Sequence, residues 1–163
     1  MIIEFEKMSL MEQVDVVQDV DVMIGVTGTG LWNALWMRNG AAGIQIFPFG
    51  VGYKGGKEFE NAIRYGPGVY RSIHCHRFFK TGVYSLKGEP CGPPRGCSPD
   101  ELLPPHMSFP ALAFLDPEEF WRQDWKHAWS TYYGQDAIVV DAATLKNIII
   151  SLPKIDSDEA EIN

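Results

Sequence analysis

The sequence lacks a long hydrophobic run and an excess of basic residues, and both absences exclude functions. No apolar stretch approaches the roughly 20 residues that a membrane-spanning helix needs, so we expect no membrane segment in this chain. Lys and Arg total 14 against 21 Asp and Glu, and the net charge is −7. This balance argues against a general nucleic-acid binder, which needs a basic face to neutralise phosphates. The first residues, MIIEFEKM, lack the basic region and the longer apolar stretch of a signal peptide.

Several catalytic motifs are also absent. The sequence has no H-E-x-x-H zinc motif and no G-x-S-x-G nucleophile motif. His74 and His76 form a His-x-His pattern, but no third and fourth ligands accompany them. We therefore expect neither a metal site nor a cofactor.

Cysteine is scarce, and its spacing leaves two states open. The chain has three cysteines, Cys75, Cys91 and Cys97, and none of them forms a C-x-x-C pair. Cys91 and Cys97 enclose the loop CGPPRGC, which a disulfide would close in an oxidising compartment. Free thiols in the same loop are the equal alternative, and the spacing does not separate the two.

The first half of the chain alternates predicted strands and helices. Ser9 with Glu12 has the spacing of a capping box, and the apolar run VDVMIGV suits a strand covered on both faces. This alternation predicts an α/β fold, a Rossmann-like doubly wound parallel sheet with helices on both faces. The predicted strands span 1–6, 20–26, 43–47 and 69–74, and the predicted helices span 9–19, 31–37 and 57–65.

The second half is less regular, and we interpret the chain as one domain over residues 1–152. A long insertion rich in Pro and Gly spans about 78–133, and loops of this length are often functional. It contains a helix predicted to begin at Asp116. A strand at 137–140 and a helix at 142–152 follow, and the acidic tail 153–163 is predicted to be disordered.

A glycine loop between a strand and a helix is the strongest candidate site. Gly28 and Gly30 separate the strand that ends at Val26 from the helix that follows. A helix N-terminus leaves main-chain N–H groups unpaired, and glycines let a phosphate approach them closely. Thr27 and Thr29 add hydroxyl donors. A tight strand-to-helix turn without a ligand is the equal alternative from the glycines alone.

Two well-known phosphate motifs do not fit this loop. A P-loop requires a lysine followed by Ser or Thr, and the loop has no lysine. A dinucleotide-binding site requires an acidic residue at the end of the next strand, and GIQIFPFGVGY has none. The sequence therefore disfavours NAD binding.

The ordered run MSLMEQVDVVQDVDVMIGVTGTGLWNALWMRNGAAGIQIFPFG carries a family resemblance. It resembles the nucleotide-sugar half of glycosyltransferase family 61, in which a helix with Glu-Gln precedes a strand, a loop reading His-Gly-Ala-Gly-Leu-Thr-Asn/His, a short helix and a strand that ends near a proline. KEFENAIRYGPGVYRSIHC and YYGQDAIVVDAATLKNIIISL are similar to later parts of that family, so the resemblance covers about 3–152 and is weaker across 82–132. The positions that match are Glu12, Gln13, Gly28, Gly30, Leu31, Asn33 and Pro48.

The resemblance implies the nucleotide-sugar-binding half of a GT-B enzyme. Such an enzyme transfers a sugar, here expected to be UDP-linked, to an acceptor hydroxyl of a glycan or glycoprotein with the help of a general base, and it needs no Asp-x-Asp metal site. It also implies location in the Golgi or ER lumen. The expected substrate-binding residues are Thr27, Gly28, Thr29, Gly30, Leu31, Asn33, Gln13 and Pro48. The catalytic residues stay unassigned.

The chain departs from the family in two respects. Thr27 occupies the place of the family's histidine and Thr29 the place of its alanine, so a side chain that titrates near neutral pH is lost. We also expect that an N-terminal acceptor domain is missing from this chain. A non-catalytic Rossmann-like binding or interaction module is therefore the alternative function, and a nucleotide-dependent oxidoreductase ranks third.

Overall fold

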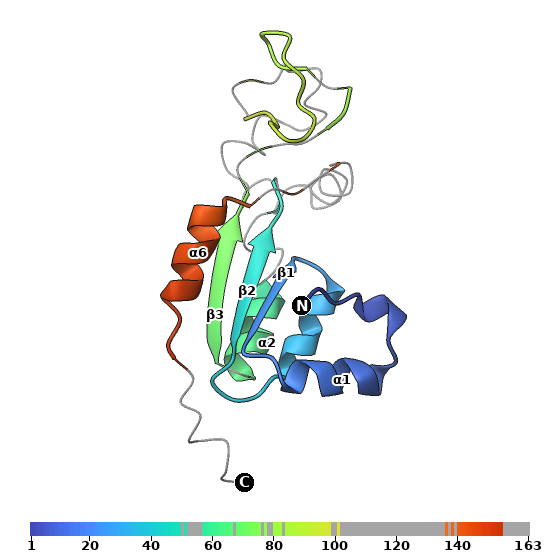
Figure 1. Cartoon of the computed structure of the whole chain (residues 1–163), viewed down its shortest axis with the longest axis vertical. Coiled ribbons are helices and arrows are strands. Elements are labelled where there is room, and N and C mark those ends of the chain that lie inside the picture. Colours follow the sequence, from blue (N-terminus) through green and yellow to red (C-terminus); the bar gives the residue numbers. More distant parts are fainter. Residues whose placement is uncertain are drawn as a thin grey trace. The chain divides into compact units, whose positions relative to one another are not determined.

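Three strands form a parallel sheet in the computed structural model, with helices packed around it (Figure 1). The strands are β1 (Val22–Val26), β2 (Ala42–Phe47) and β3 (Val69–His74), and they lie in the order β1-β2-β3. Every residue of β2 is buried, as expected for the central strand. The α/β class is therefore confirmed. A doubly wound sheet requires a reversal in strand order, and these strands follow the sequence order, so that part of the prediction stays untested.

The structure describes residues 1–49, 51, 57–66, 68–75, 77, 80–82, 84–98, 101, 136, 138 and 140–154. The chain divides into two units, which we describe separately: one comprises Met1–Gln45, Glu58–Ser72 and Ala142–Asn163, and the other Ile46–Lys57 and Ile73–Asp141. The predicted helix that begins at Asp116 and most of the insertion lie outside the described residues. So do two of the four residues of the strand predicted at 137–140 and most of the acidic tail.

The first helix, α1 (Leu10–Gln18), begins as its sequence predicts. The Ser9 hydroxyl accepts a hydrogen bond from the Glu12 main-chain N–H, and the Glu12 carboxylate accepts one from the Ser9 N–H at 2.7 Å. These reciprocal bonds lower the pKa of the Glu12 carboxyl. The capping box is confirmed, and it leaves Val17 buried on the inner side of the helix.

Two predictions for the N-terminal unit are wrong. Residues 1–6 do not form a strand. The segment leads instead into the 3-10 helix η1 (Phe5–Lys7), in which the Lys7 N–H donates to Glu4 O. A strand needs a partner, and no described strand pairs with this segment. The predicted coverage of β1 on both faces is also wrong, because the Ile24 residue is 42% exposed.

Glycine packing joins α2 (Lys57–Tyr65) closely to β2. A Cβ added at Gly43 would lie 2.3 Å from Ile63 Cδ1, so only glycine leaves room for this helix to approach. Phe59, Ala62 and Ile63 are buried, which confirms the predicted inner face of the helix. The helix ends where Gly68, at φ +102°, donates its N–H to Ile63 O at 2.7 Å.

The last described helix, α6 (Ala142–Ile150), also matches its prediction, although none of its residues is buried. Ser151 closes it by donating its hydroxyl to Ile148 O at 2.7 Å. Across the described residues, no helix is long and apolar enough to cross a membrane.

Candidate functional site

The glycine loop joins the carboxyl end of β1 to the 3-10 helix η2 (Thr29–Trp36), at the position that the sequence predicts. The first hydrogen bond of η2 runs from Leu31 N–H to Gly28 O at 3.1 Å. The N–H groups of Thr29 and Gly30 precede this bond, so they have no partner within the helix. Thr29 is exposed and Gly30 is partly exposed, and their N–H groups lie where an anion is favoured.

Gly25 and Gly28 differ in whether the packing around them requires a glycine. A Cβ added at Gly25 would lie 2.6 Å from Leu31 Cδ2, so this glycine is needed to pack η2 on β1. Gly28 has extended backbone at φ 171°, and an added Cβ would meet only Val26 O at 3.7 Å. Neither backbone conformation nor packing requires glycine at this position. Gly28 therefore leaves open space that a ligand can approach.

Two predicted site residues, Gln13 and Asn33, hold the loop in place through hydrogen bonds. The Gln13 side-chain amide donates to the main-chain oxygens of Phe5 and Met8, at 3.0 and 3.1 Å, and its Oε1 accepts from Asn33 Nδ2 at 3.1 Å. Asn33 Nδ2 also lies 3.2 Å from Gly30 O. Asn33 is buried, so these side chains fix α1, the N-terminal segment and the loop relative to one another.

Thr27 does not present its hydroxyl to solvent. The residue is 1% exposed, and its Oγ1 accepts a hydrogen bond from Gln45 Nε2 at 3.0 Å. Gln45 Oε1 accepts in turn from the Tyr70 hydroxyl at 2.9 Å. A buried chain of hydrogen bonds thus joins Gln45 of β2 to Tyr70 of β3 and to Thr27, which follows β1. Burial is the main cause that raises the pKa of Tyr70 to about 12.

An ion pair lies beside Tyr70. Arg64 Nε donates to Glu60 Oε1 at 2.6 Å, and the Arg64 guanidinium lies 5.6 Å from the centre of the Tyr70 ring. The other Glu60 oxygen is buried and has no hydrogen-bond partner among the described residues. The Glu60 charge also contributes to the raised pKa of Tyr70.

Sequence reasoning assigned neither Gln45 nor Tyr70 to the site. The signal for Gln45 was present, because it is the one polar side chain in the apolar run GIQIF. Of the remaining predicted residues, Leu31 is buried against Gly25 and anchors η2. Pro48 is also buried, but it belongs to the other unit.

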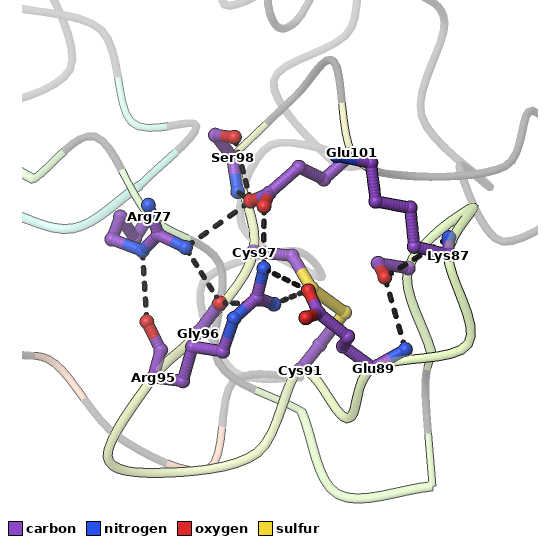
Figure 2. A network of polar contacts seen from close by, with 10 residues as sticks. Arg77, Lys87, Glu89, Cys91, Arg95, Gly96, Cys97, Ser98 and Glu101 are labelled. Carbon is purple, nitrogen blue, oxygen red and sulfur yellow. Dashed lines mark hydrogen bonds and ion pairs between the residues drawn. A yellow bond between two sulfur atoms is a disulfide. The ribbon is translucent and has the colours of Figure 1, made fainter.

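The second unit contains a disulfide surrounded by charged side chains (Figure 2). Cys91 and Cys97, whose state the sequence left open, are bonded, and both are fully buried. Arg77 donates to Arg95 O and Gly96 O, both at 2.8 Å, and to Glu101 at 3.1 Å. The hydrogen bonds from Arg77 to the main-chain oxygens of Arg95 and Gly96 therefore hold the disulfide loop in place.

Glu101 is the acceptor at the centre of this network (Figure 2). Its Oε2 accepts from the Ser98 N–H at 2.8 Å and the Ser98 hydroxyl at 2.7 Å, and its Oε1 accepts from Arg95 at 2.5 Å. The bonds from Ser98, followed by the charges of Arg95 and Arg77, lower the pKa of Glu101 to about 2. The carboxylate is charged at any physiological pH.

The histidine predicted at the end of β3 makes an aromatic contact. The His74 ring stacks on Phe47 with ring centres 4.4 Å apart, while His76 lies outside the described residues. Within the described ranges, no group of three or more His, Cys, Asp and Glu is arranged to hold a metal ion.

One comparison with known proteins bears on this site. Residues 1–44 match the model of the glycosyltransferase 61 family. The family resemblance is thereby confirmed for this part of the chain, which contains α1, β1, the glycine loop, η2 and the first residues of β2. Beyond residue 44 the resemblance to glycosyltransferase 61 stays a prediction. No curated protein and no solved structure matches the chain.

Proposed function

We propose that this chain supplies the donor-binding half of a glycosyltransferase and holds the diphosphate of a nucleotide sugar at Gly28–Gly30. The observation that carries the proposal is the match of residues 1–44 to glycosyltransferase 61, because the matched segment contains the N–H groups of Thr29 and Gly30, which precede the first hydrogen bond of η2. An anion-binding loop alone would fit many phosphate ligands. The family match supports an activated sugar as the ligand.

Four of the predicted site residues then have distinct tasks. The N–H groups of Thr29 and Gly30 donate to the phosphates, with the exposed Thr29 hydroxyl as a further donor. Gln13 and Asn33 are positioning residues, since they hold the carbonyl of Gly30 and the neighbouring segment in place. In the reaction the bond between the anomeric carbon and the phosphate oxygen breaks, the acceptor oxygen bonds to that carbon, and a general base takes the acceptor proton.

The finer assignments are parts of the same proposal. We take UDP as the carrier nucleotide and the hydroxyl of a glycan or glycoprotein as the acceptor, with a separate N-terminal domain forming the acceptor site. We also place the protein in the Golgi or ER lumen. The Cys91–Cys97 disulfide supports this location, because such bonds persist in oxidising compartments.

Calorimetric titration of the chain with UDP and UDP-sugars tests the donor site. The variant Gly28→Ala should weaken binding by on the order of tenfold without loss of thermal stability, since its new methyl group meets only Val26 O at 3.7 Å. Gly92→Ala is a matched control, because its Cβ would also make an ordinary contact, at 3.6 Å from Thr81 Oγ1. The donor site is refuted if folded wild-type protein does not bind at millimolar ligand, or if both variants bind equally.

A specific observation favours a non-catalytic binding module as the second candidate. Thr27 replaces the family's histidine, and its hydroxyl is buried and already hydrogen-bonded to Gln45, so it cannot exchange a proton with substrate near neutral pH. Product assays with the family's N-terminal domain added in trans separate the candidates. Sugar transfer excludes the inactive module, and donor binding without transfer supports it.

A further inference from the structure

The side chains of η2 lie in rows along the helix, and one of these rows is exposed. A 3-10 helix has three residues per turn, so side chains three positions apart are eclipsed. Leu31 and Ala34 form a buried row. Thr29, Trp32 and Leu35 form a second row, and every residue in it is exposed. The exposed row begins at Thr29, whose N–H is assigned above to the phosphates of the donor.

Trp32 presents an aromatic surface in this row. It lies one turn further along the helix than Thr29, a rise of about 6 Å. Its ring meets the ring of Phe59 edge to face, with centres 5.4 Å apart and an angle of 63° between the planes. Phe59 belongs to α2 and is only 5% exposed, so a buried side chain holds the indole, whereas Trp32 itself is 43% exposed. The indole is therefore fixed in place and open to solvent, one turn from the glycine loop.

This tryptophan also departs from the family's loop pattern. The pattern of glycosyltransferase 61 has threonine directly after the leucine that corresponds to Leu31, and this chain has Trp32 there. A threonine side chain has no ring on which a planar ligand could stack. The aromatic surface beside the glycine loop is thus a property of this chain's own sequence.

The chemistry of a nucleotide sugar identifies the part of it that suits this surface. Beside its diphosphate, the molecule carries two sugar rings and a nucleobase, and only the nucleobase is a planar π system. Nucleobases stack on aromatic side chains, and this contact needs no charged partner. We propose that Trp32 is the stacking surface for the nucleobase of the donor. The inference rests on the proposed donor site and assigns to it a residue that contacts the base.

Calorimetric titrations with UDP and with inorganic pyrophosphate separate the stacking surface from the phosphate site. Trp32→Ala should weaken UDP binding by on the order of tenfold and leave pyrophosphate binding unchanged, because only UDP carries a base. Trp32→Phe should keep most of the UDP affinity, since it retains an aromatic ring. Trp36→Ala is the matched control, because Trp36 is 50% exposed but lies in the third row of η2, with Asn33. The control variant should bind UDP like wild type.

Proton NMR of UDP mixed with the wild-type chain gives a readout that needs no variant. The signals of the two uracil ring protons should move upfield on binding, because a base stacked on an indole lies in the ring current of that indole. This measurement stands even if Trp32→Ala fails to fold. Bound UDP without an upfield shift overturns the proposal.

The titrations also distinguish failure of the stacking surface from failure of the donor site. Equal losses of UDP and pyrophosphate binding in Trp32→Ala, or no loss of either, overturn the stacking and leave the donor site in place. A loss that affects UDP-glucose but not UDP also overturns it, because the sugar ring would then contact the indole. If the folded wild-type chain binds neither UDP nor pyrophosphate, the donor site itself is refuted, and the role of Trp32 with it.

Discussion

Replacing Tyr70 by phenylalanine tests the buried chain of hydrogen bonds that crosses the sheet. The change removes the hydroxyl that donates to Gln45 Oε1 at 2.9 Å, while the ring beside Arg64 is retained. Gln45 is fully buried, so its oxygen loses a donor that water cannot replace. A buried acceptor left without a partner costs about 1–3 kcal/mol, which lowers the melting temperature of a chain of this size by about 2–4 °C per kcal/mol.

Urea unfolding followed by circular dichroism measures this loss. The midpoint should fall while the slope of the transition stays constant, because the surface exposed on unfolding does not change. Tyr65→Phe is the matched control, since Tyr65 is 88% exposed and the same substitution there should cost less than about 0.5 kcal/mol. If the two variants lose equal stability, the Tyr70–Gln45 bond does not exist in solution and the reasoning is refuted.

The pH dependence of stability gives the same variant a second readout. The pKa of Tyr70 is raised from 10.0 to about 12, first by burial and then by Glu60. Between these values the unfolded chain releases a proton that the folded chain keeps, so stability is present below pH 10 and falls as the pH rises toward 12. Tyr70→Phe should flatten this part of the stability curve.

Three further predictions concern other parts of the chain. Gly43→Ala places a methyl group 2.3 Å from Ile63 Cδ1, and we expect about 1–3 kcal/mol of destabilisation in urea unfolding, which Ile63→Val should partly recover. Ser9→Ala removes the capping bond to the Glu12 N–H and should cost about 1 kcal/mol by the same measurement; no loss would show that the cap does not stabilise α1 in solution. The low pKa of Glu101, about 2, means that its network is fully formed above pH 4.5 and weakens as the pH falls toward 2. Proteolysis of the loop 77–101 should therefore accelerate in acid. The variant Glu101→Gln should be cleaved faster than the wild-type chain already at neutral pH.

Local sequence signals predicted most of the described elements. Ser9 with Glu12 marked the start of α1, and the period of Phe59, Ala62 and Ile63 predicted the inner face of α2. The strand predicted at 1–6 was wrong because apolar spacing alone does not supply a neighbouring strand. Tertiary packing determines which buried polar side chains form hydrogen bonds with one another, and a local sequence pattern does not contain this information. Sequence reasoning therefore did not assign Gln45 to the site.

The place of the glycine loop in the fold was predictable from the sequence, but the hydrogen bonds around the loop were not. The order of strand, glycines and helix located the loop, and the first hydrogen bond of η2 begins at the Leu31 N–H, after Thr29 and Gly30. The roles of Gln13 and Asn33 could not be predicted, because their hydrogen bonds join segments that are distant in sequence. The Cys91–Cys97 bond depends likewise on the conformation of its loop, which the spacing of the two cysteines does not fix.

The hydrogen-bonded chain through Thr27, Gln45 and Tyr70 has a consequence for how the strands align. β2 is buried along its whole length, so its hydrophobic pattern does not distinguish one alignment with its neighbours from another that is shifted along the strand. A shift would separate the fully buried Gln45 amide from both of its hydrogen-bond partners. These three side chains therefore specify the register of the sheet.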